Sequence, residues 1–99
     1  MSKQIAIDEY VTTVLMRDLV GHDHSPSGFL VYLYLLSETR RLKIPRIRAS
    51  YQTIAEATGL SKSAVQLAVR GLVSRELLRV AKESATATPE YRVLRPWKR

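Results

Sequence analysis

The stretch TIAEATGLSKSAV, from Thr53 to Val65, decides the fold of this chain because its spacing is that of two short helices joined by a tight turn. Ser50 lies just before it and can cap the first helix. Ile54 and Ala55 are then the residues that face inward. Gly59 follows four residues after Ala55, where the chain must turn with a residue that tolerates positive φ. The sequence therefore predicts a helix, a turn and a second helix.

The second helix is predicted to begin after a cap at Ser61 and to run to about Arg75. One side repeats apolar residues at helical spacing: Val65, Ala68, Val69 and Leu72. The other side is polar, and its residues fall three or four positions apart: Lys62, Ser63, Gln66 and Arg70. Leu67 would lie beside them. The second helix is thus expected to be amphipathic, with hydrogen-bonding groups pointing away from the core.

Two helices are predicted before this motif. The first opens at Asp8 and ends near Val20, with Gly21 as its stop. Its apolar residues are not confined to one stripe, which fits either contact with a second copy of the chain or a loosely amphipathic helix on a monomer. The next helix starts at Ser25-Pro26 and runs to about Leu42. It should be the central helix, since its first half is apolar nearly all round.

Three short strands complete the pattern. Residues 46–48 alternate polar and apolar and predict an edge strand after Pro45. Residues 77–82 and 91–94 predict a β-hairpin, joined by the small polar stretch 83–89. Trp97 is expected to pack against an end of that hairpin.

This order of elements resembles winged helix-turn-helix transcription regulators, over about Ser25 to Leu94. The most specific part is SYQTIAEATGLSKSAVQLAVRGLVSRELLRV, from Ser50 to Val80. It looks most like the DNA-binding portions of the GntR-like and MarR-like groups. The resemblance implies a mainly α fold with a small β-hairpin wing, in which a three-helix core carries an extra N-terminal helix. The second helix of the motif would enter the major groove.

The resemblance also sets the expected organisation. Residues 1–99 form a single winged helix-turn-helix domain, with an N-terminal helical extension at 1–24, a core at 25–94 and a tail at 95–99. Neither the effector domain of the GntR-like group nor the longer dimerisation helices of the MarR-like group fits, so no small-molecule effector is expected. Many relatives have glycine where the second helix ends, but residues 74–77 have none. Gly71, inside that helix, is expected to permit close packing.

Charge supports a nucleic-acid partner. The chain has 16 Lys and Arg against 9 Asp and Glu, a net charge of +7. The first 39 residues hold 2 basic and 5 acidic residues, whereas the remainder holds 14 and 4, so the positive surplus surrounds the motif. Phosphate contacts are expected from basic and hydroxyl residues on either side of the second helix: Arg46, Arg48, Ser50, Tyr51, Ser61, Arg75, Lys82 and Arg92.

Base reading is expected from the polar side of the second helix, by Lys62, Ser63, Gln66 and Arg70. Glutamine can pair with adenine through two hydrogen bonds, and lysine or arginine can pair with guanine. Leu67 could meet a thymine methyl group if it is exposed. These groups would give sequence preference, and the cations around them would give affinity.

Other site types are less well supported. The chain has no cysteine, which removes thiolate metal sites and favours a cytoplasmic protein. The eight-residue run Phe29 to Leu36 is far shorter than the roughly 20 residues that span a bilayer. His22, Asp23 and His24 suggest a metal site, but a polar loop explains them, and no cofactor is predicted. Ser25 and Ser27 lack an orienting acid at recognisable spacing, so no enzyme is predicted.

The sequence therefore predicts sequence-specific binding of double-stranded DNA by a bacterial transcription regulator, as a homodimer through residues 8–20, with the central helix as a second candidate contact. A plasmid or phage replication or partition factor shares this DNA chemistry and stays open as an alternative. A winged helix used as a protein-interaction module is a third possibility. It would not require the positive surplus around the motif.

Overall fold

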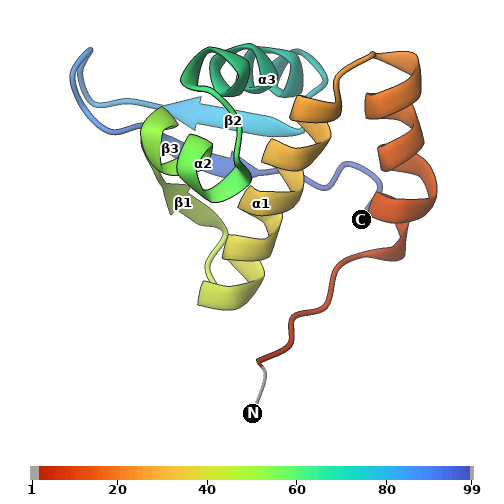
Figure 1. Cartoon of the computed structure of the whole chain (residues 1–99). Coiled ribbons are helices and arrows are strands. Elements are labelled where there is room, and N and C mark those ends of the chain that lie inside the picture. Colours follow the sequence, from red (N-terminus) through yellow and green to blue (C-terminus); the bar gives the residue numbers. More distant parts are fainter. Residues whose placement is uncertain (1–2, 99) are drawn as a thin grey trace.

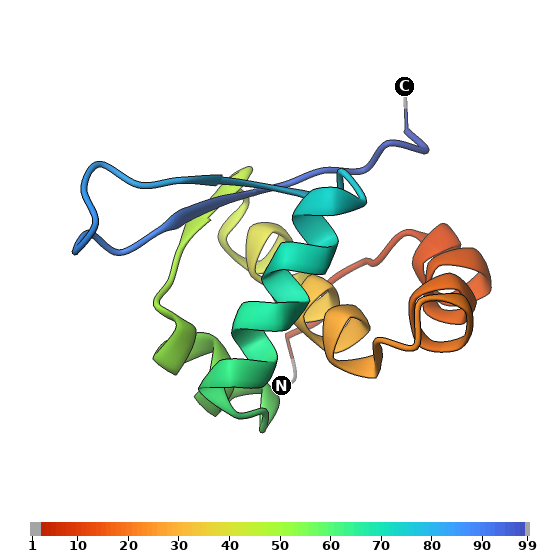
Figure 2. The ribbon, with the colours of Figure 1, turned by 90° about the horizontal axis from the view of Figure 1, so that it is seen from above.

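The computed structural model describes residues 3–98, and the chain forms a helical layer on one side of a small sheet (Figures 1 and 2). The elements, in chain order, are η1 (Val11–Leu15), η2 (Asp18–His22), α1 (Pro26–Leu42), β1 (Arg46–Arg48), α2 (Tyr51–Thr58), α3 (Lys62–Ser74), β2 (Leu78–Ala81) and β3 (Glu90–Val93). The mainly α fold with a β-hairpin is as predicted.

The sheet is antiparallel with strand order β1-β3-β2, so β1 is an edge strand as expected. Alternate residues face the helices: Ile47, Leu78 and Tyr91 are buried. Their neighbours along each strand face the opposite way, as the two-residue period of a strand requires. We call this opposite side the outer sheet face. The hydroxyl of Tyr91 is buried without a hydrogen-bond partner in the described chain, and burial raises its pKa.

Helix α1 is the central helix, in contact with α2, α3 and the sheet. Ser25 caps it by accepting a hydrogen bond from the amide of Gly28 at 3.0 Å. Its buried residues include Phe29, Tyr32 and Leu35. It ends at Lys43, which takes a left-handed conformation at φ 58°. The predicted start and end of this helix are therefore confirmed.

The N-terminal helix differs from the prediction. Its helical backbone runs on through Gly21 to His22, and two stretches, η1 and η2, are π-helical. Val11, Leu15 and Leu19 are buried at intervals of four residues. That interval exceeds the 3.6-residue repeat of an α-helix, and i→i+5 turns lengthen the repeat, which keeps the three side chains on one stripe. The expected stop at Gly21 was wrong, because η2 includes that glycine.

Asp8 ties the two ends of the described chain to α1. Its carboxylate accepts hydrogen bonds from Arg40 at 2.9 Å, from Arg95 at 3.2 Å and from the indole of Trp97 at 3.0 Å. Trp97 stacks on Tyr10 with ring centroids 4.6 Å apart. We call Asp8, Arg40, Arg95 and Trp97 the Asp8 clasp. The tryptophan thus packs against the N-terminal helix, and not against an end of the hairpin as predicted.

Helix α3 ends without glycine, as its sequence requires. Glu76 takes the left-handed conformation at φ 60° that glycine often supplies, and the amide of Leu77 then donates to the carbonyl of Leu72 at 2.9 Å. Gly71 does not serve close packing: a Cβ at this position would meet nothing within 4 Å outside its own helix. The expectation of close packing there was therefore wrong.

Candidate nucleic-acid interface

Helices α2 and α3 are built by their caps and the turn between them. Ser50 accepts from the amide of Thr53 at 3.0 Å, and Ser61 accepts from the amide of Ala64 at 3.1 Å. Gly59 has φ 81°, a conformation that costs other residues about 1–2 kcal/mol. The buried residues Ile54, Ala55 and Val65 lie on the sides of α2 and α3 turned to the core. All of these local predictions are confirmed.

The four predicted base-reading residues lie together on the exposed side of α3. Lys62, Ser63, Gln66 and Arg70 are all exposed. Among the described residues, Lys62, Gln66 and Arg70 make no side-chain hydrogen bond or ion pair, whereas Ser63 lies 3.2 Å from the hydroxyl of Ser61. Figure 2 shows α3 nearest the viewer with no other element in front of it. This side is open to a partner, and the base-reading roles stay predictions.

Leu67 is the most exposed large apolar side chain of the described residues, at 65%. It lies on the flank of the same polar side, and the next exposed position along that flank is Gly71. The exposed surface of α3 therefore has an apolar flank as well as polar groups. From the sequence, Leu67 is a candidate DNA contact only if its side chain is exposed, and that exposure depends on which elements pack against α3.

Three of the predicted backbone contacts lie where α2 and α3 begin. Ser50 and Tyr51 are half-buried at the start of α2, and Tyr51 packs against the core. Ser61 is exposed at the start of α3. Both serine oxygens already cap their helices, so a phosphate here would meet hydroxyl protons and free backbone amides.

Arg75 and Lys82 lie at two other places near α3. Arg75 follows the helix, and its Nε donates to Asp23 at 2.8 Å, which links α3 to the N-terminal helix. Lys82 stands at the start of the hairpin loop, and its Nζ donates to the carbonyl of Ala85 at 3.4 Å. The wing thus carries one lysine, beside Glu83, and that lysine is folded back onto the loop.

The remaining predicted backbone contacts, Arg46, Arg48 and Arg92, lie on the outer sheet face. The structure thus separates them from the exposed side of α3. Arg79 lies with them because it pairs with Arg92 in the register of β2 and β3. Strand register decides this grouping, and no local sequence signal reveals it.

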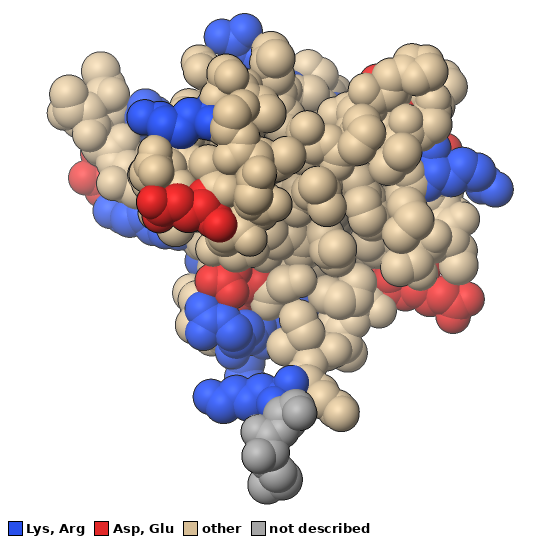
Figure 3. Space-filling view, in the orientation of Figure 1, with Lys and Arg blue, Asp and Glu red and all other residues tan. Residues whose placement is uncertain are grey.

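Other cations near the motif have structural partners. Arg40 and Arg95 belong to the Asp8 clasp, and Arg41 donates two hydrogen bonds to Glu38, at 2.8 and 2.9 Å. Figure 3 shows that the middle of the face over α1 is largely uncharged, with both basic and acidic side chains around it.

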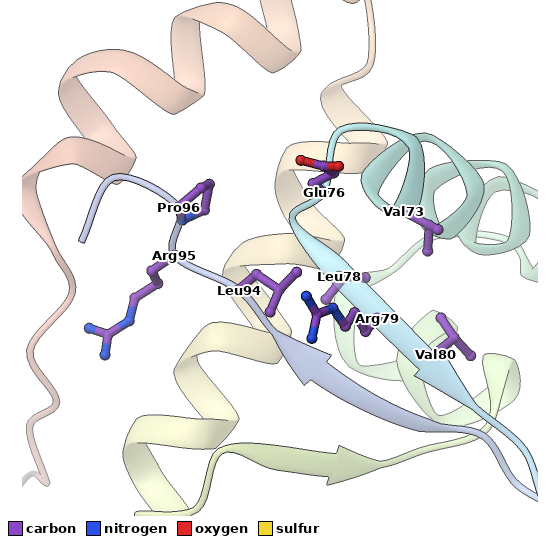
Figure 4. Close-up of a pocket in the computed structure, with 8 residues that line it drawn as sticks. All are labelled: Val73, Glu76, Leu78, Arg79, Val80, Leu94, Arg95 and Pro96. Carbon is purple, nitrogen blue, oxygen red and sulfur yellow. The ribbon is translucent and has the colours of Figure 1, made fainter. Parts of the chain in front are cut away.

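A hollow of about 690 Å³ lies between the end of α3, β2 and the C-terminal segment (Figure 4). Its lining is mixed: Val73, Glu76, Leu78, Arg79, Val80, Leu94, Arg95 and Pro96. Within residues 3–98 no group of three or more His, Asp or Glu side chains could hold a metal ion. His22 instead contacts Asp23 at 2.9 Å. No helix in this described part is long and apolar enough to cross a membrane.

The chain matches no protein-family model and no curated protein in sequence. In structure it is similar to the crystal structure of the AntR antimony-specific transcriptional repressor, with a TM-score of 0.53 and 21% sequence identity. The match covers 97% of this chain and 75% of that one. At this identity the likeness establishes the fold, a winged helix, and does not distinguish a GntR-like from a MarR-like chain.

Proposed function

We propose that this chain binds duplex DNA in a sequence-specific manner and regulates transcription, with α3 seated in the major groove. The observation that carries the proposal is the unpartnered polar side of α3, where Lys62, Gln66 and Arg70 are exposed on a helix whose other side is fixed in the core. The similar repressor AntR adds support through its fold.

The exposed residues of α3 suit different bases because their side chains differ in chemistry. Gln66 suits adenine, and Arg70 or Lys62 suits guanine, because each pair makes two hydrogen bonds in the major groove. Ser63 adds a hydroxyl that suits several bases. Leu67 offers an apolar contact to the thymine methyl group.

Backbone contacts would hold this helix in register. The starts of α2 and α3, at Ser50, Tyr51 and Ser61, present amides and hydroxyls to phosphates beside the groove. Within residues 3–98 Arg75 bonds Asp23 through its Nε alone, so its terminal nitrogens would be available to a phosphate. Lys82 would add a contact from the wing. The prediction that no small-molecule effector takes part stays a prediction.

A homodimer suits this function, since a two-fold symmetric protein binds two half-sites. The N-terminal helix offers the surface: Met16 and Val20 are exposed at 40% and 38%, on the flank of the buried stripe. We place this activity in the bacterial cytoplasm, where the DNA is. A palindromic binding site would support the dimer.

The test is a gel shift on random duplex DNA followed by selection of bound sequences. We expect a defined site, and a fall of log K with log salt at a slope near −5 if about six phosphates are contacted per protomer. Gln66→Ala should change the selected sequence at one or two positions. Equal weakening on all sequences would contradict base reading by Gln66, and flat salt dependence would contradict DNA binding as a whole.

A further inference from the structure

Three arginines stand in one row across the outer sheet face. In the register of the sheet, Arg46 pairs with Arg92, and Arg92 pairs with Arg79. All three side chains are exposed and lie on the face opposite the buried Ile47 and Tyr91. Because adjacent strands lie about 4.8 Å apart, the three side chains start from neighbouring positions on this face. We call these residues the arginine row.

The sheet neutralises only part of this row. Like charges directly opposite one another destabilise a strand pair. Glu90 is the one carboxylate on this face of the described sheet, and it lies 3.8 Å from Arg46 and 3.6 Å from Arg48. Arg79 and Arg92 make no ion pair with any described residue. The row therefore carries a repulsion that an anionic partner would relieve.

The row also borders open space. A hollow of about 290 Å³ is lined by all three arginines together with Val80, Ala81 and Glu90. Figure 4 shows the side chain of Arg79 extending from β2 toward β3. An anion on this face would reach guanidinium groups from three strands at once.

We propose that the arginine row binds the sugar-phosphate backbone of DNA that flanks the segment seated on α3. The planar guanidinium group matches phosphate through two parallel hydrogen bonds. The row begins on β2, the strand that contacts α3, and continues across β3 to β1. Strand β2 thus connects the row to the helix that carries the interface proposed above, on which this inference rests.

Because the outer sheet face and the exposed side of α3 face away from the core in different directions, flanking DNA reaches the row only by bending toward the sheet. Hydrogen bonds between the row and the phosphates would offset the cost of the bend. The row would then favour sites whose flanks bend easily, without reading any base there.

The experiment uses the full chain and two duplexes, one that covers only the selected site and one with about ten further base pairs on each side, about one helical turn. The double variant Arg79→Gln/Arg92→Gln, called the row variant, is compared with Lys3→Gln/Lys98→Gln, which removes two exposed charges elsewhere. On the long duplex, the slope of log K against log salt should be less steep by about 2 for the row variant, because two phosphate contacts are lost. It should also abolish the bend seen by energy transfer between the duplex ends.

On the short duplex the row variant should bind like the control. Equal losses on both duplexes, or no loss on either, would overturn the proposal. So would a row variant that loses binding to polyglutamate while its DNA binding is unchanged, since the partner would then be an acidic protein. Without DNA, the row variant should unfold at the same temperature as the natural chain or at a higher one, because a repulsion between arginines has been removed.

Gln66→Ala on the same two duplexes separates this inference from the proposed function. If Gln66→Ala loses sequence preference while the row variant binds the short and long duplexes equally well, base reading by α3 stands and DNA binding by the arginine row is rejected. If Gln66→Ala keeps its sequence preference while the row variant loses affinity on the long duplex alone, base reading by Gln66 is rejected and DNA binding by the row stands. Absence of binding to either duplex would overturn both.

Discussion

The Asp8 clasp and the exposed side of α3 treat charge in opposite ways. In the clasp, one carboxylate with 17% of its side chain exposed accepts hydrogen bonds from two arginines and a tryptophan. On α3, Lys62, Gln66 and Arg70 are exposed and have no partner among the described side chains. The first arrangement holds the fold together, whereas the second leaves its hydrogen-bonding capacity free for another molecule. Changes in the clasp should therefore alter stability, and changes on α3 should alter binding.

The largest effect is expected from Asp8→Ala. This change removes the hydrogen bonds that Arg40, Arg95 and Trp97 donate to a charged group, and it leaves the two arginines without their shared carboxylate. We expect the free energy of unfolding to fall by about 2–3 kcal/mol. The measurement is urea unfolding followed by Trp97 fluorescence.

Asp18→Ala is the matched control, because Asp18 lies on the helix that follows Asp8 and makes no ion pair in the described chain. DNA affinity of the folded Asp8→Ala protein should be unchanged. A large loss of affinity at a temperature where this variant is fully folded would break the separation between clasp and interface.

Low pH should also weaken the Asp8 clasp, but by less than Asp8→Ala does. Burial raises the pKa of Asp8, but hydrogen bonds from Trp97 and Arg40 and the charge of Arg95 outweigh it and hold the pKa below its ordinary value of 3.8. A carboxyl with a lowered folded-state pKa contributes stability that is complete above the unfolded-state pKa. That contribution is lost as pH falls through the folded-state pKa.

The stability difference between the natural chain and Asp8→Asn should therefore be constant near neutral pH and shrink below about pH 4. Unfolding curves at several pH values measure it. Asp23 and Glu38 also have lowered pKa values, from the hydrogen bonds of His22 and of Arg41 respectively, and they remain in both proteins. A difference that stays constant down to pH 2 would show that the charge of Asp8 is not what stabilises the clasp.

The same contrast explains what could be predicted from the sequence. Caps and turns act within four residues, so Ser25, Ser50 and Ser61 were enough to place the starts of α1, α2 and α3. The partners of Asp8 lie 32, 87 and 89 residues away, and no local pattern reveals such contacts. The side of α3 that faces outward followed from helical periodicity. The arginine row did not, because it depends on which residues pair between strands.

Glu76 lies at the end of α3 and belongs neither to the Asp8 clasp nor to the exposed polar side of that helix. Its φ of 60° is costly for a residue with a Cβ. Glu76→Gly should raise the free energy of unfolding by about 1 kcal/mol, because the relief of strain exceeds the added freedom of the unfolded chain. Thermal or urea unfolding measures this gain. Glu76→Ala, which keeps a Cβ, is the control, and an equal gain in both would contradict the strain argument.

Leu67 tests the opposite half of the comparison. Its side chain is 65% exposed, so Leu67→Ala should leave stability within about 0.5 kcal/mol of the original. If it contacts a thymine methyl group, the variant should lose about 0.8 kcal/mol of DNA affinity, the value of one buried methyl-sized group. Replacing thymine by deoxyuridine at each position of the selected site measures this directly.

The two changes at Leu67 and thymine should not add. At the position that Leu67 contacts, removal of the thymine methyl group should weaken binding by the natural chain and have little effect on Leu67→Ala. Fully additive effects at every thymine would remove Leu67 from the interface. The polar residues of α3 would then be its only reading groups.

Gly71 carries the smallest expected change and joins both halves of the comparison. A Cβ there meets nothing within 4 Å outside the helix, and its φ is not in the left-handed range, so Gly71→Ala should stabilise the fold by about 0.5 kcal/mol. The gain is modest because the position is close to the end of α3 at Ser74.

Since this glycine follows Leu67 along the exposed flank, the missing side chain would also let a DNA backbone approach the helix closely. The two measurements should then diverge: a higher unfolding midpoint together with weaker binding to the selected duplex. Ser74→Ala, a change near the same end of α3, is the control, because it adds no side-chain atom to the flank that carries Leu67. Stronger or unchanged binding by Gly71→Ala would mean that the glycine neither packs nor admits a partner, and that α3 meets DNA only through the side that carries Gln66 and Arg70.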